Sequence, residues 1–511
     1  MVDLFGTKRL RTEVAGLRAE IAEEQRRRLA AERVARRSSR NYTAALASRL
    51  SSGWSTSPVA PDQFLRSDLR SLRARAREQY RNNDYARRFV GMVRANVVGD
   101  PGIRMQSRIV DPDGKTDFLA NRAVEDRWSD WCRAEHCDVE ARNNWLGLQT
   151  LFVNTAAIDG EVLILKSYTN PRHGLSLRFA DPEIIDTQYN DVLPSGNVVR
   201  LGVEFDGSGR RAAYYLTSGA PSPSTYDSLS LRRIRVPADQ VIHAFVPEYV
   251  GQVRGVPWMA SALGPLRMLE GYLDAALVAA RVGAAKMGFY STEDGPGYDG
   301  TGEDPSSGEL LEDVEPGTFG KLPAGTTLSS WSPEYPKGEM PEFVKLALRR
   351  IASGFGVSYN ILANDLEGVN YSSIRAGILD EREMWKALQN WMVREFCQPV
   401  YESWLRTQLQ LGTLTVPTST GLPKPLNPDK EDKYRSVFWS CRRWPWVDPL
   451  NDMQAAEKTV QMGAGTVSEI IRDRGLEPEE VWRERSSEKE LMKNLGAEAP
   501  PADARSGVSN A

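Results

Sequence analysis

Apolar side chains recur at helical spacing in two stretches that flank a short polar loop. The first stretch covers residues 343–355 and ends at the glycines Gly354 and Gly356. The second runs from about residue 371 to Gln410, with apolar side chains at Ile374, Ile378, Leu379, Trp385, Leu388, Trp391 and Met392. Asn370 or Ser372 can cap its first turn. The pattern predicts two helices joined by an acidic, glycine-bearing loop with no catalytic signature, which is typical of a part that moves or makes contacts.

The rest of the chain alternates between helical and strand-like patterns. The expected helices cover residues 8–40, 62–80, 82–97, 145–157, 258–287 and 451–495. The helix over 82–97 is capped by its first asparagines and has an apolar face formed by Tyr85, Phe89, Val93 and Val97. The expected strands cover residues 103–109, 161–168, 175–180, 198–205, 212–217 and 241–246, with a hairpin turn at 207–209.

Composition excludes several classes of protein. The 511 residues suffice for roughly three domain-sized units. No stretch reaches the ~20 apolar residues of a membrane span, because charged residues interrupt even the apolar segment 263–290. The first residues lack the apolar core of a signal peptide, and four scattered cysteines are too few for a disulfide framework. We therefore expect a cytosolic, reduced protein that does not contact a membrane.

Charge is distributed unevenly along a chain whose net charge is only −3. Residues 8–49 contain 12 basic and 5 acidic side chains, whereas residues 290–342 contain 12 acidic and 2 basic ones. Separate partners for the two segments explain this asymmetry, and a solvated surface is the alternative for each.

The search for catalytic or metal-binding motifs finds no complete set. The segment 317–321 has the wrong spacing for a phosphate-binding loop. Cys132, His136 and Cys137 resemble metal ligands, but no second pair completes a tetrahedral set, so we expect no metal and no cofactor. No motif for nucleophilic catalysis is present, and the chain is predicted not to be an enzyme.

Two segments have a functional and a structural interpretation. Asp159-Gly160-Glu161, followed by Lys166, is compatible with a metal-dependent nuclease, but a turn that opens a buried strand is favoured because residues 161 and 166 face opposite sides of a strand. The arginine-rich helix over 66–81 could bind phosphates, yet an oligomer interface or a solvated face fits it at least as well.

An ordered set of short motifs resembles one known family. The motifs are Arg81-Asn82-Asn83, Asn96-Val97-Val98-Gly99, the pair Trp128 and Trp131, Asp159-Gly160-Glu161, Arg254-Gly255-Val256-Pro257, Asn370-Tyr371-Ser372-Ser373-Ile374-Arg375 and Trp446-Val447-Asp448-Pro449. Over roughly residues 40–490 the chain resembles the lambda-type phage portal proteins.

The resemblance implies a portal fold of the α+β class that assembles as a ring. Its parts would be a basic N-terminal arm and linker (1–61), a β-rich wing (62–257), a stem helix (258–289), a small acidic α/β clip (290–340), a second stem helix (341–362), a tunnel loop (363–371), a long wing helix with its connection (372–447), a helical crown (448–495) and a disordered tail (496–511). The role of the arm stays open between contacts with scaffold, coat protein or DNA, and removal by proteolysis.

The resemblance also implies the function. Twelve copies would form a connector at one capsid vertex of the virion, after assembly in the host cytoplasm, and double-stranded DNA would pass through it non-specifically. The implied partners are the terminase large subunit, a head-completion adaptor, and the major capsid and scaffold proteins. The tunnel-loop residues would be Asn364, Asp365, Leu366, Glu367, Gly368, Val369 and Asn370. The docking residues of the clip would be Glu303, Asp304, Glu309, Glu312, Asp313 and Glu315.

The charges of the loop suit a channel through which DNA slides. Lysine or arginine would hold the duplex by releasing its counterions, whereas Asp365 and Glu367 would repel phosphate and keep contacts brief. Two alternatives remain at this point: a nuclease of the same assembly pathway, and a DNA-binding adaptor that forms no pore and binds through residues 8–88.

Overall fold

The computed structural model describes residues 4–38, 58–217, 233–284, 288–292, 326–330, 340–367, 371–418, 422–444, 449–474, 476 and 478–494. The chain divides into two units, Met1–Ala60 and Pro61–Ala511. In the first unit the structure describes one helix, α1 (Leu4–Ser38), and its side chains from residue 13 to residue 30 are all exposed. The helix predicted at the N-terminus is confirmed, and the predicted tail over 496–511 lies outside the described residues.

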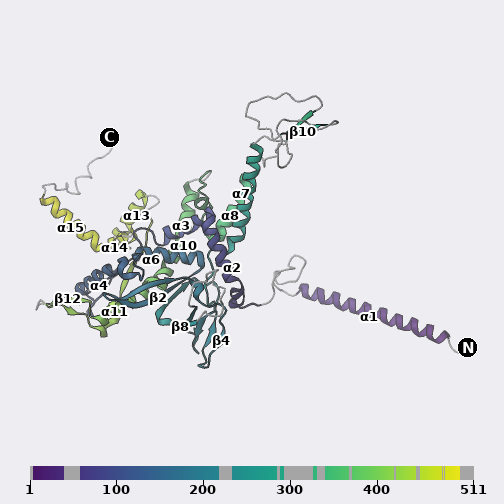
Figure 1. Ribbon diagram of the computed structural model, residues 1–511, viewed down its shortest axis with the longest axis horizontal. Helices are drawn as coiled ribbons and strands as arrows, with labels where there is room; N and C mark the ends of the chain where they lie inside the picture. Colours follow the sequence, from purple (N-terminus) through teal and green to yellow (C-terminus); the bar gives the residue numbers. More distant parts are fainter. Residues whose placement is uncertain are drawn as a thin grey trace, which may run out of the picture. The chain divides into compact units, whose positions relative to one another are not determined.

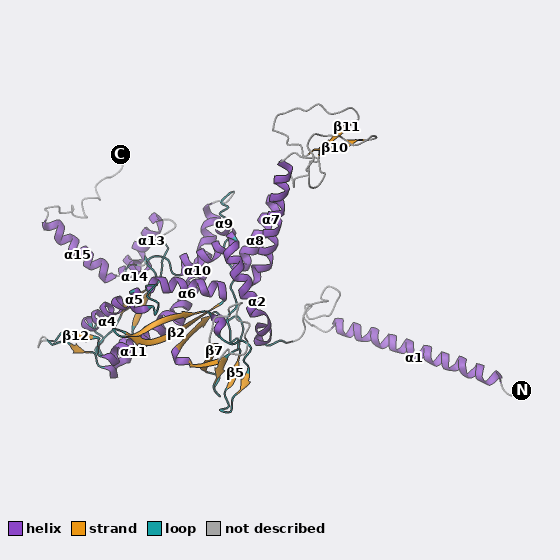
Figure 2. Ribbon diagram, viewed as in Figure 1, coloured by secondary structure: helices purple, strands orange, loops and turns teal. Residues whose placement is uncertain are grey.

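The second unit contains the remaining helices and all the described strands (Figure 1, Figure 2). The helices are α2 (Pro61–Asn82), α3 (Asp84–Val97), α4 (Phe118–Trp131), α5 (Ala134–Cys137), α6 (Trp145–Asp159), α7 (Leu263–Ala284), α8 (Met340–Phe355), α9 (Tyr359–Ala363), α10 (Tyr371–Met392), α11 (Gln398–Leu411), α12 (Glu431–Tyr434), α13 (Pro449–Gln461), α14 (Val467–Asp473) and α15 (Pro478–Asn494). The strands are β1 (Arg104–Ser107), β2 (Glu161–Asn170), β3 (Gly174–Ala180), β4 (Asp191–Val192), β5 (Val198–Arg200), β6 (Val203–Phe205), β7 (Arg211–Thr217), β8 (Arg233–Pro237), β9 (Val241–Phe245), β10 (Gly288–Thr292), β11 (Thr326–Ser330), β12 (Thr415–Val416), β13 (Lys424–Pro425) and β14 (Val437–Ser440).

Two antiparallel sheets form the β-rich part. One has the strand order β3-β2-β9 and the other the order β4-β5-β6-β7-β8. The central strand β2 begins with the buried residues Glu161 to Ile164, which pair with β9. β1 pairs with β14, so residues about 330 positions apart in the sequence meet in one small sheet. The predicted α+β class is confirmed.

The larger hydrophobic core lies between the β3-β2-β9 sheet and the helices, and aromatic residues are prominent in it, while a smaller cluster joins the two sheets. Trp128 of α4 contacts five aromatic rings whose centroids lie 4.8–6.1 Å from its own, namely those of Trp131, Trp145, Tyr401, Trp404 and Trp439. Asn83 caps α3 as predicted, because its side chain accepts hydrogen bonds from the backbone N–H groups of Tyr85 and Ala86. Phe89 from the predicted apolar face stacks on Phe355 of α8 at 4.3 Å.

The helix predicted to end near Gln410 is confirmed, but it contains an irregular turn. α10 continues through a π-helical turn, Val393–Cys397, into α11, which ends where Gly412 adopts φ 65°. Pro399 has no N–H to donate to the carbonyl of Glu395, and a wider turn accommodates that loss. The sequence pattern did not predict this turn, because apolar spacing does not resolve a single inserted residue.

One predicted strand is wrong. Residues 198–205 were expected to form a continuous strand, but the chain reverses at Leu201 and Gly202, which adopt φ 49° and 81°. These two left-handed residues form the tight turn between β5 and β6. The turn was not predicted from the sequence, because leucine rarely adopts this left-handed conformation. The turn predicted at 207–209 is confirmed between β6 and β7.

None of the helices in the described ranges is long and apolar enough to cross a membrane.

Candidate functional site

The predicted loop over 364–370 follows α9 and is described as far as Glu367. Asn364 ends α9 in a left-handed conformation, with φ 53° and ψ 31°. Gly368, Val369 and Asn370 lie outside the described residues. The six residues predicted to form the docking surface of the clip also lie outside them: Glu303, Asp304, Glu309, Glu312, Asp313 and Glu315.

Asp365 is used to hold the loop in place. Its Oδ2 accepts a hydrogen bond of 2.6 Å from the Tyr359 hydroxyl, and its Oδ1 accepts one of 3.1 Å from the backbone N–H of Glu367. The hydrogen bond from Tyr359 lowers the pKa of Asp365, while burial and the bond to this carboxylate raise the pKa of Tyr359 to about 12. The charge that the described loop exposes most fully is therefore that of Glu367, beside an exposed Leu366.

Helices on both sides fix the base of the loop. Arg88 of α3 donates a hydrogen bond of 3.2 Å to the side-chain oxygen of Asn364. Glu381 of α10 accepts hydrogen bonds from the backbone N–H of Ser358 and from the indole N–H of Trp385. Residues of α3 and α10 therefore hold the two ends of α9, and with them the first residue of the loop, in place.

The paired helices α7 and α8 carry apolar side chains that the described chain does not cover. The two helices lie side by side (Figure 1), and Tyr272 of α7 contacts Phe343 of α8 at 5.0 Å between ring centroids. More than half of the side-chain surface is exposed at Met268, Leu277, Val278, Phe343 and Leu346. Such a group of apolar side chains is typical of a surface that contacts another protein.

A buried charge network was missed by the sequence analysis. Glu161, the first residue of β2, is fully buried and accepts hydrogen bonds from Arg73 of α2 at 2.5 Å and from Arg254 at 2.9 Å. Its other oxygen accepts the backbone N–H of Gly255 at 2.7 Å and lies 3.0 Å from His243 Nε2. Burial alone would raise the pKa of Glu161, but Arg254 and Arg73 outweigh it and hold that pKa well below its usual value.

Two arginines of the basic helix α2 form ion pairs with acidic residues elsewhere in the chain. Arg73 is 1% exposed, and Arg77 forms ion pairs with Asp159 at 2.6 Å and with Asp181 at 2.8 Å. Arg66 and Arg70 remain exposed. The buried side of α2 is neither a phosphate-binding site nor a solvated face. Its guanidinium groups instead join α2 to the start of β2.

The same contacts argue against a nuclease site at Asp159 and Glu161. Both carboxylates are occupied by arginine side chains, which a catalytic metal ion would have to displace. Gly160 ends α6 with φ 83° before β2 begins, which confirms the favoured prediction of a turn that opens a buried strand.

Two of the short motifs meet at this network. A Cβ atom added to Gly160 would overlap the backbone of Val256, and one added to Gly255 would overlap the carbonyl of Gly160. Gly160 and Gly255 therefore permit the backbones of the two motifs to come into direct contact. Next to this contact, Arg254 forms an ion pair with Glu161. A charged residue at the head of an apolar run, Glu161 before Val162, was the available sequence signal.

A family profile and individual relatives of known sequence agree on one protein family. The profile of a family described as phage portal protein, lambda family, matches residues 47–389. The chain is 34% identical over 469 residues to a probable portal protein of Halomonas phage phiHAP-1, in an alignment that covers 90% of this chain and 88% of that protein. It is 21% identical over 488 residues to portal protein B of Escherichia phage lambda, with 88% of each chain covered.

The chain also matches solved structures from gene transfer agent (GTA) particles. A chain in the neck of the native GTA particle, computed with C12 symmetry, is 15% identical, with a TM-score of 0.40 and coverage of 80% of this chain and 94% of that chain. A chain in the virion of the native particle gives 14% identity and the same TM-score and coverage. These values are too low for a residue-by-residue comparison.

Proposed function

This chain belongs to the lambda family of phage portal proteins, and on that basis we propose that twelve copies form a closed ring around a channel for double-stranded DNA. The ring would occupy one vertex of the capsid, after assembly in the host cytoplasm, and DNA would enter and leave through it. The protein would act by geometry and contact, without catalysis, membrane insertion or a cofactor.

The exposed apolar group on α7 and α8 is the observation that supports a ring most directly. In the described part of one subunit, α8 already buries Leu348 and Ile351, while Phe343 and Leu346 on the same helix remain exposed. In a ring every subunit offers the same surfaces to its neighbours, so apolar residues outside the subunit core would be covered by the next copy. We assign α7 and α8 to the stem on this basis.

The loop after α9 is proposed to narrow the channel. A twelve-fold ring would repeat the exposed Leu366 and Glu367 twelve times around the duplex, which would combine apolar contact with repulsion of phosphate. Asp365 would have a different task from the one expected from the sequence, because its carboxylate binds Tyr359 and orients the loop. Gly368 to Asn370 would complete the tip.

The energy for packaging would come from a separate motor, the terminase large subunit. We propose that the acidic segment 290–340 docks this motor and later a head-completion adaptor, since its charge would steer a basic partner surface. Reversal of Glu312 and Asp313 that left motor binding unchanged would refute this assignment. The capsid and scaffold proteins would contact the outer part of the ring.

Electron microscopy and native mass spectrometry of the purified protein test the ring. We expect closed rings from the wild type. The substitution Leu346→Asp should abolish most of them, because each carboxylate buried unpaired between two subunits costs on the order of 3 kcal/mol. Leu422→Asp changes an equally exposed leucine outside α7 and α8 and should leave the rings intact. Wild-type monomers under all salt conditions would contradict the proposed function.

The loop is tested by DNA binding to the purified protein. We expect Glu367→Lys to strengthen binding of a short duplex at low salt by about tenfold or more, and this gain to disappear at higher salt, because each lysine that neutralises a phosphate releases counterions. The control is Glu383→Lys, which makes the same change at an exposed acid on α10. Equal binding by both variants would show that Glu367 does not face the DNA.

A further inference from the structure

We propose that Asp130, His136 and His173 bind one divalent transition-metal ion, for which zinc is the best match. This set, the His–Asp cluster, is independent of the channel and of ring formation. Imidazole nitrogen and carboxylate oxygen are the ligands that zinc accepts in proteins, and three such ligands leave a fourth position for water. No metal was expected from the sequence, in which the candidate ligands beside His136 were Cys132 and Cys137.

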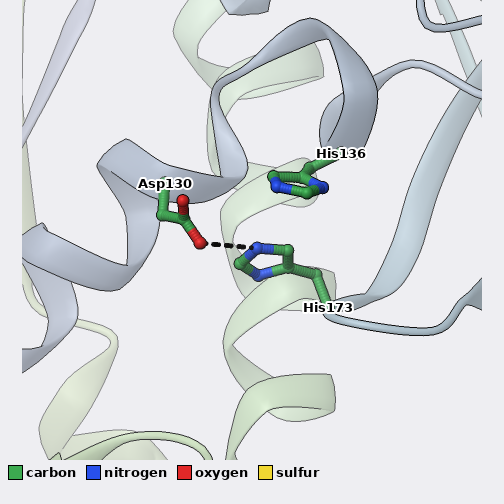
Figure 3. Close-up of side chains that lie close together, drawn as sticks. All are labelled: Asp130, His136 and His173. Atoms are coloured by element: carbon green, nitrogen blue, oxygen red, sulfur yellow. Dashed lines mark hydrogen bonds and ion pairs between the residues drawn. The ribbon is translucent and has the colours of Figure 1, made fainter.

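The three side chains converge from three different segments (Figure 3). Asp130 lies in the last turn of α4, His136 in α5, and His173 in the turn between β2 and β3. Each offers one ligand atom, and these atoms lie within 4.8 Å of one another. His173 Nε2 is 3.1 Å from Asp130 Oδ2, and the two imidazole rings are 4.7 Å apart between centroids. Small side-chain rotations would bring these atoms to the spacing of ligands around one ion.

The backbone around both histidines is already ordered. The side chain of Asn170 accepts the backbone N–H of His173 at 2.9 Å and donates to the carbonyl of His136 at 3.1 Å. Gln408 of α11 donates a further hydrogen bond of 2.6 Å to the carbonyl of His173. A metal ion would therefore bind a largely preformed site and would not have to order these segments itself.

His173 has unused bonding capacity in a buried place. Its side chain is fully buried, and its Nδ1 has no hydrogen-bond partner among the described residues. The other ring nitrogen, Nε2, lies 3.1 Å from Asp130 Oδ2 and is the atom that would bind the metal ion.

The cysteines of the sequence-based candidate set do not belong to the site. The Cys137 thiol donates to the carbonyls of Cys132 and Asn143. The proposed site thus shares His136 with the candidate set considered from the sequence, and it has Asp130 and His173 in place of the two cysteines.

The positive charges of nearby arginines oppose the binding of a metal ion at Asp130. They also provide a specific test, because removing one of these charges should strengthen binding. Arg172 lies 2.7 Å from Asp130 Oδ2, and Arg133 lies 3.5 Å from its other oxygen. Both arginine side chains are more than half exposed, so they can turn toward solvent when a metal ion takes the carboxylate. A third, Arg127, lies 3.7 Å from Asp130 Oδ2, is only 20% exposed, and would stay near the ion. We therefore expect micromolar rather than nanomolar affinity, and tighter binding once Arg172 loses its charge.

The test is a Co²⁺ and Zn²⁺ titration of untagged, full-length protein treated with a chelator and dialysed. We expect one equivalent per subunit and the visible absorption of Co²⁺ bound to nitrogen and oxygen ligands. The chain has three histidines, and the third, His243, is fully buried against Glu161, so the signal has one expected source.

Variants separate this site from general metal binding. His136→Ala should weaken binding by about tenfold or more without unfolding the protein, because this residue is only half-buried. Glu135→Gln changes an exposed acid in the same short helix and should bind as the wild type does. Arg172→Gln should strengthen binding severalfold, a result that a purely structural role of the cluster does not predict. Absence of saturable binding by the wild type, or equal binding by His136→Ala, would overturn the proposal.

Discussion

Replacement of Glu161 by glutamine is expected to reduce the free energy of unfolding by about 3–5 kcal/mol. Glutamine keeps the size and the acceptor oxygen of the side chain, so Gly255 can retain its hydrogen bond. The negative charge is lost, and Arg73 and Arg254, which are 1% and 0% exposed, would remain buried without the carboxylate that both contact. A loss of this size is a large fraction of the stability of a typical domain. Soluble yield and the urea midpoint measure it.

Two further variants show whether the charge is responsible. Arg70→Gln removes an exposed arginine of α2, 3.9 Å from Glu183, and should change stability by less than about 0.5 kcal/mol. Arg254→Met alone should be as harmful as Glu161→Gln. The double variant should lose less than the sum of the two, because each change removes the partner that the other leaves unpaired. Additive losses would show that the two residues do not stabilise the fold through each other.

Elements defined by local patterns were predicted well from the sequence. α3 and the continuous helix α10–α11 follow from apolar spacing, and Asn83 caps α3 as expected. The turn at Leu201 and Gly202 was missed because its first residue adopts a conformation that leucine normally avoids. The π-helical turn was missed because periodicity tolerates one extra residue.

The pairing of charges could not be read from the sequence. Glu161 contacts arginines 88 and 93 positions away, and no spacing rule relates such distant residues. For the same reason α2 was compared with phosphate-binding helices although its buried side faces Asp159 and Glu161. In the loop, Asp365 and Glu367 look alike in sequence, and only the fold shows that Tyr359 engages one of them while the other stays exposed.

The approach of two backbones at Gly160 leads to the second large effect. Gly160 has φ 83°, and an added Cβ would overlap the carbonyl carbon of Val256 and the nitrogen of Pro257. Backbone atoms cannot turn aside as a flexible side chain can, so Gly160→Ala would push the segment after Arg254 away from β2 and weaken the contact of Arg254 with Glu161.

We expect Gly160→Ala to cost about 4 kcal/mol or more, or to yield no soluble protein. Gly196→Ala is the matched control, because Gly196 has a similar φ of 86° but no heavy atom within 4 Å of an added Cβ. It carries the same conformational penalty, about 1–2 kcal/mol, without the collision. The difference between the two urea midpoints therefore isolates the contact between the backbones at Gly160 and Val256. Equal midpoints would mean that this contact relaxes at little cost and that the charge network alone holds the two segments together.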